Sequence, residues 1–200
     1  MDIAVIDYGG GNVFSVVHAL RRLGANPTLT DSAEIISKAD KVVFPGQGEA
    51  SSSMQNLRQK GLDEVIRNLR QPILGICIGQ QLMCSHSEEG DTDCLGIFDV
   101  PVLRLRPEDR TLKVPHMGWN SLEIVKDEGL FKDFKGGEYV YFVHSFYVPV
   151  CDWTIATTEY AQPFSAALHR DNFYATQFHP EKSGSVGEKI LKNFLSLCER

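Results

Sequence analysis

The segment from Pro72 to Leu82 constrains the fold more than any other part of the sequence. An apolar run, Ile73 to Ile76, ends at Cys77 and passes directly into a helical pattern. Gly75 and Gly79 stand two residues either side of the cysteine, which is the spacing of a nucleophile elbow, where a strand turns sharply into a helix. The helix dipole at such a turn favours a thiolate. A buried structural cysteine at a strand end fits the same segment, because Cys is among the most buried residue types.

Short apolar runs alternate with helical patterns through the first half of the chain. The expected strands are residues 3–6, 26–30, 41–44 and 72–76, and the expected helices are 12–23, 32–38, 54–70 with a break at Gly61, and 78–86. Strands that alternate with helices at short spacing indicate a parallel sheet covered on both faces, with its functional site at the carboxyl ends of the strands.

After Glu88 the pattern changes to short β-like segments, followed by one last helix at residues 186–197. The expected strands are 97–105, 111–114, 121–125, 138–143, 153–158, 165–168 and 173–177. The sequence therefore predicts an α/β fold with a mixed, mostly parallel sheet flanked by helices, to which antiparallel strands are added. No repeat, linker or low-complexity segment interrupts it, so we expect a single domain over residues 1–200.

Composition excludes several classes of protein. Twenty basic against 26 acidic side chains give a formal charge of −6, which argues against a nucleic-acid or anionic-membrane surface. The five cysteines form neither a CxxC pair nor a cluster with histidine, which indicates reduced thiols, no disulfide framework and no metal site. No apolar run approaches the length of a membrane span, and the N-terminus does not resemble a signal peptide. We expect a soluble, cytoplasmic protein.

A cysteine nucleophile needs a base, and His179 is the best placed of the six histidines. It follows an expected strand and so lies at the same sheet edge as Cys77. Residues two apart in an extended segment point the same way, with Cα atoms roughly 6.6 Å apart, so Glu181 can reach the imidazole. A carboxylate that orients the base completes a Cys-His-Glu triad. His-Pro-Glu by itself also fits the plain end of a strand; its combination with the elbow favours catalysis.

The same chemistry requires hydrogen-bond donors for an oxyanion. The N–H of Ile78, the first residue after the turn, supplies one. A glycine loop at the end of a neighbouring strand, Gly46-Gln47-Gly48, offers another. Glycine-rich loops are common, so this loop is weak support when taken alone.

These motifs, in this order and separation, resemble the class I (triad) glutamine amidotransferases. Within that family the sequence more closely resembles the glutaminase subunits of imidazole glycerol phosphate synthases. The segments that carry the closer resemblance are Asp-Tyr-Gly-Gly-Gly-Asn at 7–12, Pro-His-Met-Gly-Trp-Asn at 115–120, Tyr-Phe-Val-His-Ser-Phe-Tyr at 141–147 and Gln-Phe-His-Pro-Glu-Lys-Ser at 177–183. The segment at 115–120 is the most specific of them.

The resemblance implies hydrolysis of L-glutamine through a thioester on Cys77, without a cofactor, with His179 as base and Glu181 as its orienter. It further implies that ammonia passes to a (β/α)8-barrel synthase subunit, the partner in a heterodimer. That partner makes imidazole glycerol phosphate and aminoimidazole carboxamide ribotide in histidine biosynthesis. The residues implied to bind glutamine are Gly48, Gln81, His144, Ser145 and Phe146. Those implied to face the synthase are Asn12, Met117, Trp119, Asn120, Tyr141 and Lys182.

Two positions depart from the family pattern. Gln47 stands where a small or β-branched apolar residue is usual, and Gln80 where methionine is usual. The long polar side chain at 47 is expected to alter the resting balance of the oxyanion loop.

Two other functions fit part of the pattern. One is the glutaminase subunit of anthranilate or pyridoxal phosphate synthesis, against which the segment at 115–120 argues. The other is a non-catalytic scaffold that regulates a partner, against which the intact Cys-His-Glu set argues.

Overall fold

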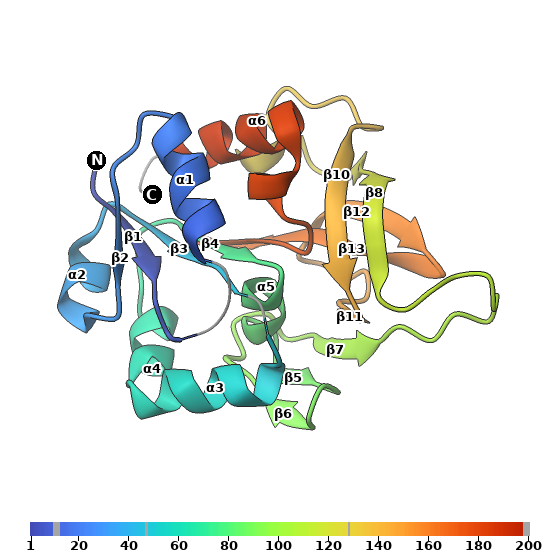
Figure 1. Ribbon diagram of the computed structural model, residues 1–200, viewed down its shortest axis with the longest axis horizontal. Helices are drawn as coiled ribbons and strands as arrows, with labels where there is room; N and C mark the ends of the chain where they lie inside the picture. Colours follow the sequence, from blue (N-terminus) through green and yellow to red (C-terminus); the bar gives the residue numbers. More distant parts are fainter. Residues whose placement is uncertain (10–12, 47, 128, 198–200) are drawn as a thin grey trace.

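The computed structural model describes residues 1–9, 13–46, 48–127 and 129–197. Within these residues an eight-stranded sheet has the order β2-β1-β3-β4-β14-β13-β12-β9 (Figure 1). Its strands are β1 (Ile3–Ile6), β2 (Pro27–Thr30), β3 (Lys41–Phe44), β4 (Ile73–Ile76), β9 (Glu123–Ile124), β12 (Thr154–Tyr160), β13 (Gln162–Arg170) and β14 (Phe173–Thr176). The first five in spatial order run parallel and the remaining pairs are antiparallel. The predicted fold class is confirmed.

Helices cover both faces of the parallel part of the sheet (Figure 1). One face packs against α1 (Val13–Arg22) and α6 (Gly184–Leu195). The other packs against α2 (Ala33–Lys38), α3 (Ala50–Gln59), α4 (Leu62–Arg67) and α5 (Ile78–Leu82).

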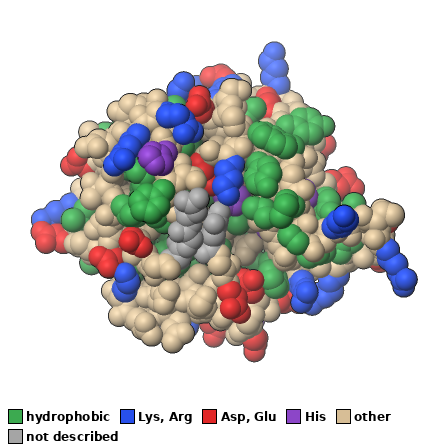
Figure 2. Space-filling view, in the orientation of Figure 1, with side chains coloured by type: hydrophobic (Ala, Val, Ile, Leu, Met, Phe, Trp, Pro, Cys, Tyr) green, Lys and Arg blue, Asp and Glu red, His purple; other side chains and the backbone are tan. Residues whose placement is uncertain are grey.

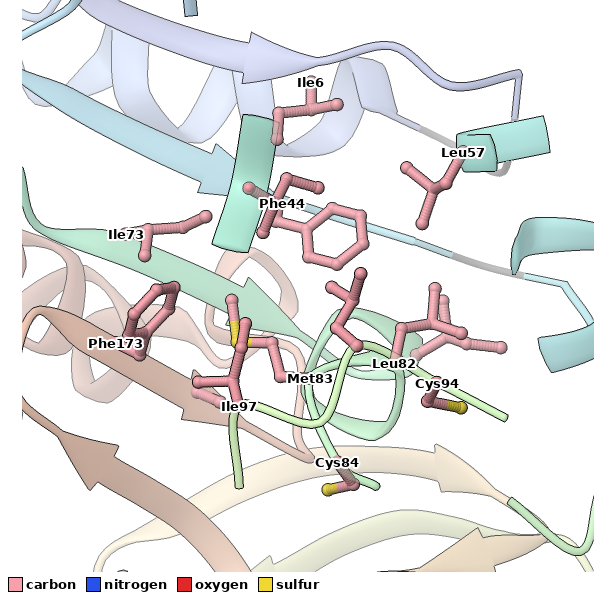
Figure 3. Close-up of a cluster of buried hydrophobic side chains, with 14 of the residues drawn as sticks. Ile6, Phe44, Leu57, Ile73, Leu82, Met83, Cys84, Cys94, Ile97 and Phe173 are labelled. Atoms are coloured by element: carbon pink, nitrogen blue, oxygen red, sulfur yellow. The ribbon is translucent and has the colours of Figure 1, made fainter. Parts of the chain in front are cut away.

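Side chains that alternate along each strand divide the core into two clusters. In β1, Ile3 and Val5 join the cluster under α1 and α6, whereas Ala4 and Ile6 join the cluster on the opposite face. Figure 3 shows the second cluster, in which Ile6 and Phe44 face Leu57 of α3. Because both faces are buried, the parallel strands read as continuous apolar runs in the sequence.

Two smaller sheets flank the central one. β8 (His116–Ser121) and β10 (Tyr139–His144) form an antiparallel pair, and the second sheet has the order β11-β7-β5-β6. Its strands are β5 (His86–Ser87), β6 (Thr92–Asp93), β7 (Pro101–Arg104) and β11 (Phe146–Tyr147). Two short 3-10 helices, η1 (Gly129–Phe131) and η2 (Pro180–Lys182), lie beside α6.

Several predicted elements differ from the structure. The expected strand at 111–114 is a turn, in which the backbone N–H and hydroxyl of Thr111 both donate to Asp109. In place of the expected strand at 121–125 the structure has two strands: β8, which begins at His116 and ends at Ser121, and the two-residue β9. The helix expected at 78–86 ends at Leu82 because the next segment donates to its last carbonyl groups, with the N–H of Leu95 on Leu82 and that of Ile97 on Met83. The break at Gly61 is confirmed, although α3 starts four residues earlier than expected.

Candidate active site

Cys77 occupies a strained turn between β4 and α5. Its φ of 55° and ψ of −107° lie in a region that L-residues rarely adopt. A Cβ on Gly79 would come within 2.1 Å of the carbonyl oxygen of Phe44, and one on Gly75 within 2.9 Å of the Gly79 backbone. Both glycines are therefore required for strand and helix to meet at the cysteine, as the elbow pattern predicts.

The loop after β3 runs against the elbow. A Cβ on Gly46 would lie 2.1 Å from a methyl of Ile78 and 2.2 Å from the Tyr8 hydroxyl, so only glycine fits there. Gly48 has a φ of +129°, which again favours glycine. Gln47 lies outside the described residues. The amide of Ile78 is the first N–H of α5 and has no partner within the helix, as an oxyanion donor requires.

His179 and Glu181 form a buried pair at the end of β14. Nδ1 of His179 lies 2.7 Å from Oε1 of Glu181, and both side chains are at most 3% exposed. Burial opposes a charge on the imidazole, but the contacts with Cys77 and Glu181 outweigh it and raise the pKa of His179 above its usual range. Because Nδ1 is committed to Glu181, Nε2 is the nitrogen left to contact Cys77 and to exchange a proton.

Strand β10 fixes the segment that carries this pair. The N–H of His179 donates to the carbonyl of Tyr141 at 2.9 Å, and the N–H of Tyr141 donates to Oγ of Ser183, also at 2.9 Å. The same hydroxyl donates to the carbonyl of His179 at 2.6 Å. Behind it, a Cβ on Gly187 would lie 1.9 Å from the carbonyl oxygen of Pro180. The turn that carries His179 and Glu181 is therefore held between β10 and α6.

The elements meet at a cleft of about 470 Å³. It is lined by Gly48, Cys77, Ile78, Gln81, Glu89, Pro115, Tyr141, Val143, His144, Ser145, Phe146, His179 and Lys182. Cys77 and His179 reach one cleft because β4 and β14 are parallel neighbours, with Ile76 in register with Thr176. All five residues expected to bind glutamine line the same cleft, as do two of those expected at the partner, Tyr141 and Lys182.

Sequence reasoning missed Glu89, whose carboxylate belongs to this cleft. It lies in the turn between β5 and β6, where its Oε2 accepts the N–H of Ala50 at 2.8 Å. Burial raises the pKa of Glu89, and the nearby Glu49 adds to the effect of burial. A lone carboxylate in a polar turn carries no periodic or motif signal, so only the tertiary structure reveals it.

Gln81 is anchored on the floor of the cleft. Its Nε2 donates to the carbonyl of Phe146 and to Oε1 of Gln177, each at 3.0 Å. Both amide hydrogens are thus used within the chain, and the carbonyl oxygen is the group that Gln81 offers to a ligand.

Two buried histidines support the cleft wall. Nδ1 of His144 donates to the carbonyl of Phe146 at 2.7 Å, so Nε2 of His144 accepts from Nδ1 of His116 at 3.0 Å. Burial lowers the pKa of His144 to about 3 and that of His116 to about 4, which keeps both rings neutral. Nδ2 of Asn120 reaches Nε2 of His116 at 3.4 Å and donates to the carbonyl of Glu159. The amide of Asn120 is therefore turned inward, toward the wall.

An apolar face lies outside the cleft. Met117 and Trp119 on β8 are 63% and 55% exposed, and the Trp119 ring packs edge-on to Tyr141 of β10 with centroids 6.1 Å apart. Figure 2 shows hydrophobic side chains gathered over β8 and β10. Asn12, the remaining residue expected at a partner, lies outside the described residues. Among the described residues no cluster of three His, Cys, Asp or Glu is placed to hold a metal ion.

The whole chain is similar to known proteins. Residues 4–198 match the family Glutamine amidotransferase class-I. An imidazole glycerol phosphate synthase subunit HisH from Bacteroides thetaiotaomicron is 60% identical over 197 residues, which cover 98% of this chain and 100% of the relative. The protein of the same name from Idiomarina loihiensis is 47% identical, with 98% of each chain covered. The chain belongs to the HisH family of class I glutamine amidotransferases.

Solved structures of other proteins share the fold of this chain. A crystal structure of a glutamine amidotransferase matches with a TM-score of 0.73 at 19% identity, covering 96% of each chain. The structure of PurLQS from Thermotoga maritima matches with a TM-score of 0.71 at 17% identity, covering 97% of each chain. The resemblance inferred from the sequence motifs is confirmed over nearly the full length.

Proposed function

We propose that this HisH-family chain is the glutaminase subunit of an imidazole glycerol phosphate synthase. It hydrolyses L-glutamine to glutamate and ammonia and delivers the ammonia to a synthase subunit. The observation that carries the proposal is the cleft itself: Cys77 and the free nitrogen of a Glu181-oriented His179 open into one space of about 470 Å³.

Formation of the thioester begins with transfer of the Cys77 thiol proton to Nε2 of His179. The sulfur attacks the side-chain amide carbon of glutamine, and the carbonyl electrons move onto oxygen. The N–H of Ile78 is one donor to that oxyanion, and the loop at Gly46 to Gly48 supplies the other. When the oxyanion collapses, the C–N bond breaks, the amide nitrogen takes the proton from His179, and ammonia leaves.

Hydrolysis of the thioester uses the same groups. His179 takes a proton from water, the resulting hydroxide attacks the thioester carbon, and the C–S bond breaks. The proton returns to sulfur as glutamate forms, so the cycle is balanced and needs no cofactor. Glu181 stabilises the imidazolium of His179 in both half-reactions. Burial of the pair strengthens this interaction, because water does not screen it.

The remaining lining groups suit the backbone end of glutamine. The carboxylate of Glu89 and the carbonyl oxygen of Gln81 match an α-ammonium group, which needs acceptors. Backbone groups of the segment from His144 to Phe146 lie on the same wall of the cleft and suit the α-carboxylate.

The apolar face on β8 and β10 fits a partner. Exposed apolar side chains that cluster beside a polar cleft mark a protein interface. We place a (β/α)8-barrel synthase subunit there, in a cytoplasmic heterodimer whose glutaminase is one domain over residues 1–200. The Lys182 ammonium lines the cleft beside this face and is our candidate for an ion pair across the interface. No described helix is both long and apolar enough to span a membrane.

The test uses the chain assembled with its synthase. Cys77→Ala should abolish glutamate production from glutamine, whereas Cys151→Ala, which removes a thiol outside the cleft, should leave it unchanged. His179→Asn removes the base that both half-reactions use, so glutamate production should fall close to the level of Cys77→Ala. Undiminished glutaminase activity in Cys77→Ala would overturn the proposed function.

A further inference from the structure

A buried amide lies at the nucleophile in addition to the triad. Gln177 follows β14, its side chain is fully buried, and its Nε2 lies 3.8 Å from the sulfur of Cys77. Its other end, Oε1, accepts the 3.0 Å hydrogen bond from Gln81. The proposed reaction assigns no task to Gln177, although its amide touches the reacting atom.

Hydrogen-bond chemistry determines which end of each amide faces which neighbour. The carbonyl of Phe146 can only accept, so the NH₂ group of Gln81 must face it. The second hydrogen of that group requires an acceptor, which is Oε1 of Gln177. The NH₂ group of Gln177 therefore faces the sulfur of Cys77. Turning this amide over would set two NH₂ groups against each other.

The sulfur has different partners in its two protonation states. The carbonyl oxygen of Val143, also 3.8 Å from the sulfur, can accept from the neutral S–H but repels a thiolate. Once the proton has moved to His179, the sulfur is an acceptor and Gln177 is its neutral donor. A hydrogen bond to an ionised group is roughly twice as strong as one between neutral groups, so this contact strengthens as the charge develops.

We propose that Gln177 is a catalytic residue whose amide N–H stabilises the Cys77 thiolate, and that Gln81 is the positioning residue that holds this amide in the donating orientation. The inference rests on the proposed function, since it concerns the same thiolate. The inference also links substrate binding to activation of the nucleophile, because Gln81 lines the cleft in which we propose that glutamine binds. Binding at Gln81 and stabilisation of the nucleophile are then connected by one hydrogen bond.

The test is alkylation of Cys77 by iodoacetamide in the full chain, followed by peptide mass mapping across the pH range. Gln177→Glu keeps the shape and the acceptor for Gln81 but, when ionised, cannot donate to sulfur. We expect its alkylation rate at neutral pH to fall at least about tenfold and the pH midpoint of alkylation to rise by at least about one unit, because the thiolate loses a charged hydrogen bond and gains a neighbouring negative charge. The other titratable groups near the sulfur and cleft stay the same in all variants: Tyr8, Glu89, His144, His179, Glu181 and Lys182.

Two further variants make the result decisive. Gln80→Met is the matched control, since Gln80 is an equally buried glutamine whose Nε2 donates to the carbonyl of Ser165 at 3.2 Å and not to sulfur; its alkylation should equal that of the wild type. Gln81→Met should slow alkylation several-fold. Iodoacetamide lacks the α-amino and α-carboxylate groups that a glutamine site binds, so loss of substrate binding alone would not slow it. This variant decides the question if the Gln177 variants do not fold. Wild-type alkylation in folded Gln177→Glu or in Gln81→Met would overturn the inference.

Steady-state kinetics of the assembled complex separate this inference from the proposed function. Gln177→Glu should lower kcat for glutamine with little change in KM, whereas Gln81→Met should also raise KM. A KM effect alone in Gln177→Glu would contradict a role at the sulfur. If Cys77→Ala retains activity, the proposed function fails, whereas the alkylation series still measures what Gln177 does to the thiolate.

Discussion

The two nitrogens of His179 lie in different surroundings, and that difference assigns their roles. Nδ1 is committed to Glu181 at 2.7 Å, whereas Nε2 is left for the contact with Cys77. The carboxylate fixes the tautomer and favours the charged ring, so in the proposed reaction Nε2 is the nitrogen that takes and returns the proton.

Replacing Glu181 by Gln should therefore impair the chemical step. The neutral amide lowers the pKa of His179 toward its ordinary value, and we expect kcat for glutamine to fall on the order of 10⁴-fold, as in other triads that lose the carboxylate charge. KM should change little, because Glu181 does not line the cleft. Glutaminase assays of the complex check this, with Glu159→Gln, an exposed carboxylate, as control. Equal kcat in the two variants would contradict the assigned role.

The residues of the site differ in how far the sequence reveals them. Cys77, His179 and Glu181 are predictable because each stands in a short pattern whose local geometry already restricts it. Glu89 and Gln177 are not, because their roles depend on what the fold places opposite them. Gln177 was visible only as part of the segment 177–183, and no local rule says that its amide reaches the sulfur.

At the scale of elements, the elbow and the β8–β10 pair organise the molecule. The parallel strands and their helices were predictable from apolar periodicity, because burial on both faces imposes it. β8 was placed too late in the sequence because its exposed residues, Met117 and Trp119, are apolar and its inward residue, His116, is polar. This pattern reverses the usual alternation of apolar residues inside and polar residues outside. An outer face that binds a partner, as proposed, accounts for the exposed apolar residues.

The elbow predicts a sharp difference between two glycine substitutions. Gly79→Ala places a Cβ 2.1 Å from a backbone oxygen, so we expect a loss of roughly 3 kcal/mol or more in the free energy of unfolding. Gly24→Ala has open space around it but a φ of +81° and should cost about 1 kcal/mol. Urea denaturation of both variants checks this. Equal losses would show that the elbow can relax.

The histidine pair predicts how stability depends on pH. Both pKa values are lowered in the folded state, so the stability that neutral rings contribute is present above the unfolded pKa, near 6.5, and is lost as pH falls toward 3. For His144 alone the loss between neutral pH and pH 5 is about 2 kcal/mol. His116→Phe should make this dependence shallower. Urea denaturation at the two pH values measures it, and parallel profiles for variant and wild type would refute the assignment.

At the scale of the whole molecule, the cleft and the apolar face share one strand. Tyr141 of β10 lines the cleft, packs against Trp119 and holds the backbone of His179. A partner bound on this face would therefore contact the strand that positions His179. Only the tertiary structure shows this connection, because it joins residues that lie far apart in the sequence.

Trp119→Ala should weaken binding to the synthase. Large aromatic residues dominate interface energies, and loss of about 2 kcal/mol would raise Kd roughly 30-fold. Ile35→Ala is the control, since Ile35 is 44% exposed on α2, at the other end of the sheet (Figure 1). Isothermal titration calorimetry compares the two. An unchanged Kd for Trp119→Ala would place the interface elsewhere.

The exposed indole on β8 has a practical consequence for spectroscopy. The chain contains two tryptophans, and the other, Trp153, is half-buried under the Arg170 guanidinium, 4.8 Å from the centre of its ring. Trp153→Phe would thus leave Trp119 as the one tryptophan, exposed to solvent and beside the strand that carries the cleft wall. The wavelength of its fluorescence maximum would then report, without any added label, when a partner buries this face.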